Sequence, residues 1–152
     1  MAVNLGKKFE DRFKVCWEKS FPISFIFRLN DQLSGFKNIS KNPCDFICFT
    51  KGVLFLVECK THKGASIPFT AIPQYESLLD YKGIVGVKPG VVIWFVDKDL
   101  VIWVSIEDME KMVQSGEKSI GIRMLTDERY DIKIIPSKKL RTFLESDYSI
   151  LV

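Results

Sequence analysis

Three residues of types that bind metal ions or move protons occur in one short stretch of the sequence: Asp45, Glu58 and Lys60. Two carboxylates held a few ångströms apart repel each other unless they share a cation, and such oxygen ligands suit Mg²⁺, for which Mn²⁺ can substitute. A bound ion of this kind polarises a phosphodiester and lowers the pKa of a coordinated water. A lysine beside that water can orient it or neutralise charge in the transition state. The trio therefore predicts metal-assisted phosphodiester hydrolysis.

A β-hairpin is expected to bring these residues together. Two β-rich segments flank Lys51-Gly52, a pair typical of a tight turn. Pairing about this turn places residues whose numbers sum to about 103 opposite each other, so Asp45 faces Glu58 across the two strands. Because side chains alternate along a strand, Glu58 and Lys60 project from the same face. We therefore expect one cluster at the open end of the hairpin. The alternative is that all three are ordinary solvated residues.

The remaining segments predict a mixed sheet flanked by helices. An apolar stripe marks the first helix (Leu5, Phe9, Phe13, Cys16 and Trp17). We predict helices at residues 4–20, 72–81, 105–115 and 136–145, and strands at 23–29, 44–50, 53–60, 90–96, 100–104, 119–125 and 130–135. Residues 30–42 and 61–71 are predicted as loops. This order indicates a single α/β domain over residues 1–152.

The composition narrows the class of protein. Hydrophobic residues make up 47% of the 152 residues, enough for a core, and no apolar run reaches the ~18 residues of a membrane span. The first residues lack an apolar stretch of signal-peptide length, so we expect a cytoplasmic protein of a bacterial or phage-infected cell, with no membrane partner. The net charge of +3 divides into +5 over residues 1–64 and −2 over residues 65–152. The half that holds the trio is thus the half suited to a polyanion.

The four cysteines raise the question of a zinc site. Cys44, Cys48, Cys59 and His62 form a superficial ligand set. Four residues along a strand cover ~13 Å, however, which is too far for Cys44 and Cys48 to share one ion. We therefore expect reduced cysteines within the core.

The order of the motifs resembles a known nuclease superfamily. Pro43-Cys44-Asp45, a twelve-residue gap and Glu58-Cys59-Lys60 are similar to the PD-(D/E)XK nucleases, and more of the chain is similar to their RecU-type Holliday junction resolvases. The similarity also includes Gly6-Lys7-Lys8-Phe9-Glu10, Asp45-Phe46, Lys60-Thr61, Ser66-Ile67-Pro68-Phe69, Gln74 and Gly90-Val91-Val92-Ile93-Trp94-Phe95. The resemblance implies a restriction-endonuclease-like fold and a Mg²⁺-dependent DNA endonuclease. It further implies a homodimer that cuts four-way junctions symmetrically in recombination and repair.

Further site residues follow from the resemblance. It implies that Glu10 joins Asp45 and Glu58 as a metal ligand, although the residue alone would read as a solvated neighbour of Phe9. It implies that Gln74 steadies the site or contacts DNA; a glutamine in the first turn of a helix is the equal alternative. Candidate DNA contacts are the basic residues of the same half, each of which could instead be simply solvated: Lys7, Lys8, Arg12, Lys14, Lys37, Lys41, His62 and Lys63.

Two other functions stay open. Residues 30–42 are short where RecU-type enzymes carry a stalk that threads the junction, so a related endonuclease of restriction or transposition type fits as well. A nuclease-derived DNA-binding subunit without activity is the non-enzyme alternative, and the intact trio argues against it. Trp94 and Trp103 are expected in the core, and Lys138, Lys139 and Arg141 on a solvated helix face.

Overall fold

A six-stranded mixed sheet, with the order β1-β2-β3-β5-β6-β8, forms the centre of the molecule. The computed structural model describes residues 4–29 and 42–152. The sheet strands are β1 Phe25–Arg28, β2 Phe46–Thr50, β3 Val53–His62, β5 Val87–Phe95, β6 Leu100–Ser105 and β8 Lys133–Ile135. Neighbours pair antiparallel except β3 and β5, which run parallel. In this part of the chain, no helix is long and apolar enough to cross a membrane.

The hairpin formed by β2 and β3 has the predicted register. Phe46 pairs with Val57 and Thr50 with Val53, so partner numbers sum to 103. The turn places Lys51 at φ 50° and Gly52 at φ 79°, as a two-residue turn that follows the twist of the strands requires. The strand β3 runs to His62 rather than ending at residue 60, because β5 offers it a parallel partner along its whole second half. The loop expected from residue 61 therefore begins later.

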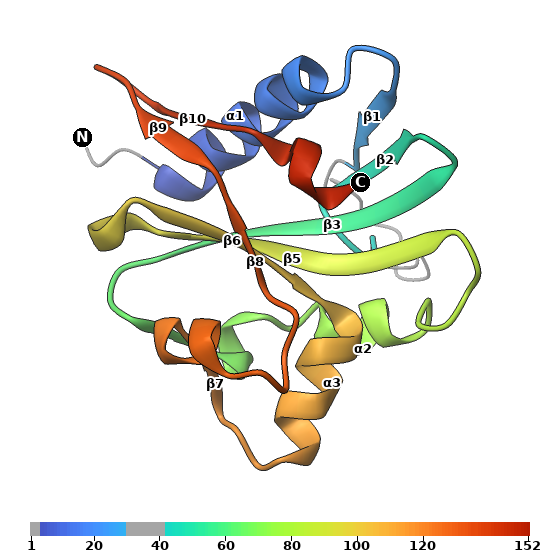
Figure 1. Cartoon of the computed structure of the whole chain (residues 1–152), viewed down its shortest axis with the longest axis vertical. Helices are drawn as coiled ribbons and strands as arrows, with labels where there is room; N and C mark the ends of the chain where they lie inside the picture. The colour runs from blue at the N-terminus through green and yellow to red at the C-terminus, as the bar shows by residue number, and fades with distance from the viewer. Residues whose placement is uncertain (1–3, 30–41) are drawn as a thin grey trace, which may run out of the picture.

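Two layers cover the sheet (Figure 1). The helix α1 Leu5–Ser20 lies on one face, with Asn4 as its N-cap, and buries Phe9, Phe13, Cys16 and Trp17 as its apolar stripe predicts. The helices α2 Tyr75–Leu79 and α3 Ile106–Gln114 lie on the other face. Strand alternation divides β3 between these layers, since Val57 and Cys59 join the core under α1 while Leu56 joins the core under α2 and α3.

Several predicted elements are shorter than the sequence indicates. The helix expected at residues 72–81 is only α2, preceded by the 3-10 turn η1 Phe69–Ala71. The strand expected at residues 119–125 is β7 Ser119–Gly121, which pairs with β4 Ser66–Pro68, and then η3 Ile122–Thr126 follows. A further turn, η2 Val96–Lys98, joins β5 to β6. The short elements are those with few residues to bury, which periodicity describes least well.

The predicted last helix is wrong. Residues 136–145 instead form the antiparallel pair β9 Ser137–Lys139 and β10 Leu144–Ser146, followed by η4 Tyr148–Leu151. The spacing of Leu140, Phe143 and Leu144 suits a helix, but the chain turns so that the Leu140 amide donates to the Phe143 carbonyl at 2.8 Å. The turn allows β10 to lie along α1 and Tyr148 to be fully buried beneath it. Burial against α1 thus overrides local propensity.

Gly90 offers a test of the packing behind the site. A Cβ added there would lie 2.5 Å from Trp103 Cη2 and 2.6 Å from the Val104 carbonyl oxygen, and Trp103 is buried. We expect Gly90→Ala to lower the free energy of unfolding by about 1–3 kcal/mol, measured by urea denaturation. Gly6→Ala is the matched control, because its Cβ meets only Asn4 Oδ1 at 3.4 Å and helical alanine stabilises by up to ~1 kcal/mol. An unchanged Gly90→Ala midpoint would contradict the close packing.

Candidate active site

Asp45, Glu58 and Lys60 lie together at the open end of the β2–β3 hairpin. Asp45 precedes β2, and its amide donates to the Val57 carbonyl at 3.1 Å. Its Oδ2 accepts a hydrogen bond of 2.9 Å from the Cys59 amide, which fixes the carboxylate beside Glu58. Lys60 Nζ lies 3.4 Å from Glu58 Oε1. The contacts follow from register and alternation, as the sequence predicts.

The electrostatics of the carboxylates are those of a buried acidic pair. Burial and the negative charge of Asp45 raise the pKa of Glu58 to about 8, against a partial opposing effect of Lys60. Burial also raises the pKa of Asp45, and the Cys59 amide counteracts this by donating to the charged form. Glu58 is only 3% exposed. The pair therefore holds a proton that a cation could replace.

Glu10 approaches this pair from α1 but is held by another residue. Burial and the charge of Asp45 raise the pKa of Glu10, which places its carboxylate within electrostatic range of Asp45. Glu10 forms an ion pair with Arg28 of β1, and Arg28 also contacts Asp11 at 2.7 Å. Across residues 4–29 and 42–152, no three His, Cys, Asp or Glu side chains are arranged to hold a metal ion. Glu10 as the third ligand remains a prediction.

Arg28 is the site residue that the sequence analysis missed. It ends the strand Phe25-Ile26-Phe27-Arg28, and its charge lowers the pKa of Asp45 as well as that of Glu10. The available signal was a single basic residue in an apolar strand, which ordinarily indicates a solvated strand end. Only the pairing of β1 with β2, which sets Arg28 opposite Phe46, brings it next to Asp45.

The donor set of the pair suits a small divalent cation. Asp45 and Glu58 present carboxylate oxygens, the ligands that Mg²⁺ and Mn²⁺ prefer. Removing the proton that Glu58 retains leaves two adjacent negative charges in a buried place, and an ion between them would relieve the repulsion. The residues present therefore fit such an ion with two protein ligands, and with Glu10 as a third if its ion pair with Arg28 opens.

The other predicted site residues have varied positions. His62 lies in β3 rather than in a loop, half-buried on the same face as Glu58 and Lys60 by alternation. Gln74 directly precedes α2, and its Oε1 is buried with no hydrogen-bond partner. Within the described residues, no hydrogen bond or ion pair joins Gln74 to the carboxylates. A role for Gln74 in the site therefore remains a prediction.

The other predicted DNA-contacting residues differ in exposure and in their partners. Lys7, Lys8 and Lys63 are exposed, and Arg12 is half-buried. Lys14 is engaged in an ion pair of 3.1 Å with Glu18. Lys37 and Lys41 lie outside the described residues. Contact with DNA at these positions stays a prediction.

The cysteines are free and buried, as expected. Cys48 and Cys59 belong to the core under α1, whereas Cys44 belongs to the core on the other face of the sheet. Burial raises the pKa of Cys44 to about 12, which keeps the thiol protonated. This division between the two faces of the sheet argues against a zinc ion shared by these cysteines.

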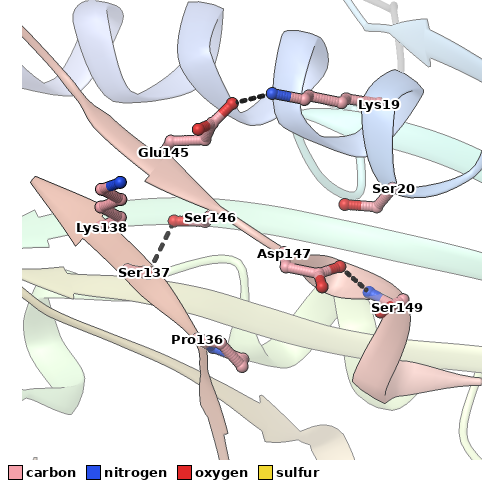
Figure 2. Close-up of a pocket in the computed structure, with 9 residues that line it drawn as sticks. All are labelled: Lys19, Ser20, Pro136, Ser137, Lys138, Glu145, Ser146, Asp147 and Ser149. Carbon is pink, nitrogen blue, oxygen red and sulfur yellow. Dashed lines mark hydrogen bonds and ion pairs between the residues drawn. The ribbon is translucent and has the colours of Figure 1, made fainter. Parts of the chain in front are cut away.

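A hollow of about 570 Å³ lies away from the trio. It lies between the carboxyl end of α1 and the β9–β10 pair (Figure 2). Its polar side chains bind one another: Lys19 pairs with Glu145, and the hydroxyls of Ser137 and Ser146 lie 2.8 Å apart. These interactions already engage several of the polar groups in its walls.

Comparisons with known proteins identify the fold. No protein-family model matches the sequence, and no curated protein matches it. Among solved structures, the chain is similar to Hjc of Archaeoglobus fulgidus, described as a Holliday junction resolvase from an archaeal hyperthermophile, with a TM-score of 0.57. The two are 18% identical, and the match covers 78% of this chain and 89% of that one. The protein thus has the restriction-endonuclease-like fold, as the sequence predicts.

Proposed function

We propose that this protein is a Mg²⁺-dependent DNA endonuclease that cuts four-way junctions. The observation that carries the proposal is the cluster of Asp45, Glu58 and Lys60 at the open end of the hairpin. A buried pair of carboxylates costs stability, and a purely structural role at this position would not need one. The fold supports the nuclease class, and the name of the Archaeoglobus neighbour supports the junction as target.

The side chains would divide the chemistry between them. Asp45 and Glu58 would hold the Mg²⁺ ion, which supplies Lewis acidity at the phosphodiester. Lys60, held against Glu58, would orient the attacking water and place positive charge next to the phosphate. The Cys59 amide keeps the Asp45 carboxylate directed at the site. Arg28 would release Glu10 when the third ligand is required.

The homodimer and the RecU-type branch are proposed on the basis of the sequence prediction. Symmetric cutting of a junction requires two active sites, so we propose that the protein acts as a homodimer. The RecU-type branch is proposed from the motif order alone. Most of the segment at the position of the RecU stalk, residues 30–42, lies outside the described residues, so the structure does not test it.

A cleavage assay tests the function. Purified protein is incubated with a labelled four-way junction or with a linear duplex of the same arm sequence, in Mg²⁺, in Mn²⁺ or in EDTA. We expect paired, symmetric cuts in the junction that require the metal. Cleavage of the linear duplex alone would favour a restriction- or transposition-type nuclease, and binding without cutting in either metal would overturn the enzyme proposal.

A further inference from the structure

A second hollow, of about 260 Å³, lies between the first turns of α1 and the turn of the β9–β10 hairpin. Its floor is apolar and aromatic, formed by Phe9 and Trp94 with Phe143 at its side, and the rings of Phe9 and Trp94 lie 5.7 Å apart. Trp94 is half-buried, unlike Trp103, which is 5% exposed in the core. The prediction that both tryptophans are core residues therefore holds fully only for Trp103.

Basic side chains surround this aromatic floor. Lys8 and Arg12 come from α1, and Lys139 and Arg141 from the hairpin. Lys139 pairs with Asp99 at 3.2 Å, but within the described parts of the chain Lys8, Arg12 and Arg141 form no ion pair. The misassigned helix explains why the sequence analysis missed this arrangement: only the hairpin brings Lys139 and Arg141 back over α1.

Arg12 occupies a distinctive position in the hollow. Its guanidinium carbon lies 3.7 Å from the centre of the Phe143 ring, in a cation–π stack. Its Nε and the indole Nε1 of Trp94 are both enclosed without a hydrogen-bond partner. Neither nitrogen is exposed to the hollow, but a ligand with both aromatic and anionic parts would suit a wall of aromatic rings and cationic side chains. A nucleotide has these parts, because every base has a stacking face and every phosphate accepts hydrogen bonds.

The hollow lies on the α1 side of the sheet and shares no residue with the candidate active site. On a helix of 3.6 residues per turn, Lys8 and Arg12 lie on one side of the Phe9 ridge and Glu10 lies on the other. Trp94 pairs with Thr61, the residue after Lys60, and faces the α1 layer. By strand alternation Glu58 and Lys60 project from the other face of the sheet, with Leu56, so the sheet separates these two side chains from the hollow.

We propose that this hollow binds an unpaired nucleotide of the DNA substrate. Its base would lie against Trp94 and the Arg12–Phe143 stack, and Lys8 and Arg141 would hold the adjoining phosphates. The proposal rests on the proposed nuclease function and deepens it: the enzyme would select DNA that contains unpaired, unstacked bases, as at a branch point.

Binding without cleavage tests the site. In EDTA, a labelled oligothymidylate of 12 nucleotides and a 12-base-pair duplex are titrated with the full chain, by fluorescence anisotropy and tryptophan emission. We expect the single strand to quench tryptophan emission and Trp94→Phe to abolish most of the quenching, because Trp17 and Trp103 are buried. Arg141→Ala should weaken single-strand binding about fivefold to tenfold and duplex binding much less. Lys118→Ala removes the same charge from an exposed position outside the hollow and is the matched control.

The outcomes separate this inference from the nuclease proposal. Equal losses in Arg141→Ala and Lys118→Ala, or quenching that survives in Trp94→Phe, would overturn the nucleotide site. Equal displacement by poly-glutamate would indicate an acidic peptide site and would also overturn it. Metal-dependent cleavage without single-strand quenching would support the nuclease function and refute the nucleotide site. Quenching without cleavage in Mg²⁺ or Mn²⁺ would support the nucleotide site and refute the nuclease function.

Discussion

Replacing Lys60 by methionine is expected to lower the rate of DNA cleavage by about 10²–10³-fold while divalent-cation binding is retained. The ammonium group lies 3.4 Å from Glu58 Oε1, where it can act on the water and on the developing phosphate charge, and loss of one such stabilising group costs about this factor. Methionine keeps the length of the side chain, so the strand packing should survive. Single-turnover cleavage of the junction and calorimetric titration with Mn²⁺ measure the two properties separately.

Asp45→Asn should differ from Lys60→Met in the binding measurement. The amide retains the shape of the side chain and removes its charge, so both cation binding and cleavage should be lost. Lys118→Met is the control for the lysine change, because Lys118 is exposed and lies outside the cluster. Wild-type cleavage by Lys60→Met would refute the assigned role, and tight Mn²⁺ binding by Asp45→Asn would refute the ligand assignment.

In the metal-free protein, Glu58→Gln is expected to raise the free energy of unfolding above that of wild type. This advantage should grow as the pH rises. The pKa of Glu58 is about 8 in the folded protein, against an ordinary value of 4.5. Below pH 4.5 the carboxyl is protonated in both states and adds no pH dependence. Between pH 4.5 and 8 only the unfolded chain releases the proton, so wild-type stability falls across this window and the loss is complete above it. The loss is on the order of a few kcal/mol, and glutamine avoids it.

Urea denaturation in EDTA at pH 5, 7 and 9 measures this effect. The advantage of Glu58→Gln over wild type should be small at pH 5 and largest at pH 9. Glu128→Gln, at an exposed position, controls for the loss of one surface charge. Added Mg²⁺ should stabilise wild type and not Glu58→Gln, because an ion between the carboxylates would take the place of the proton. A Glu58→Gln protein that is less stable than wild type at pH 9 would contradict a buried carboxyl with a raised pKa.

The two experiments bear on one property of the site. A buried carboxylate pair weakens the fold when no cation is present, yet the same repulsion is what favours binding a cation. If both results hold, the repulsion between Asp45 and Glu58 lowers the stability of the metal-free protein and is retained because it favours cation binding. If only the pH result holds, the pair is an acidic cluster without catalysis, and the non-enzyme alternative gains support.

The sequence by itself determined the hairpin and the positions of Asp45, Glu58 and Lys60 on it. Lys51-Gly52 sets a two-residue turn, the turn sets the register, and strand periodicity sets the face of Glu58 and Lys60. These are local relations between residues close in the chain, so they can be derived without knowing what packs around them. The apolar stripe of α1 and the layering of α/β elements follow from periodicity in the same way.

Only the tertiary structure decided what surrounds the trio. Arg28 meets Glu10 because β1 pairs with β2 beneath α1, and the end of the chain forms a hairpin because α1 gives Tyr148 a place of burial. The basic and aromatic hollow arises where Arg12 and Phe143 come together from distant parts of the chain. Residues 136–145 carry a helical spacing that local propensity favours, and burial against a distant helix outweighs that preference. Burial between segments that are distant in the chain produces no periodic pattern of apolar residues in the sequence.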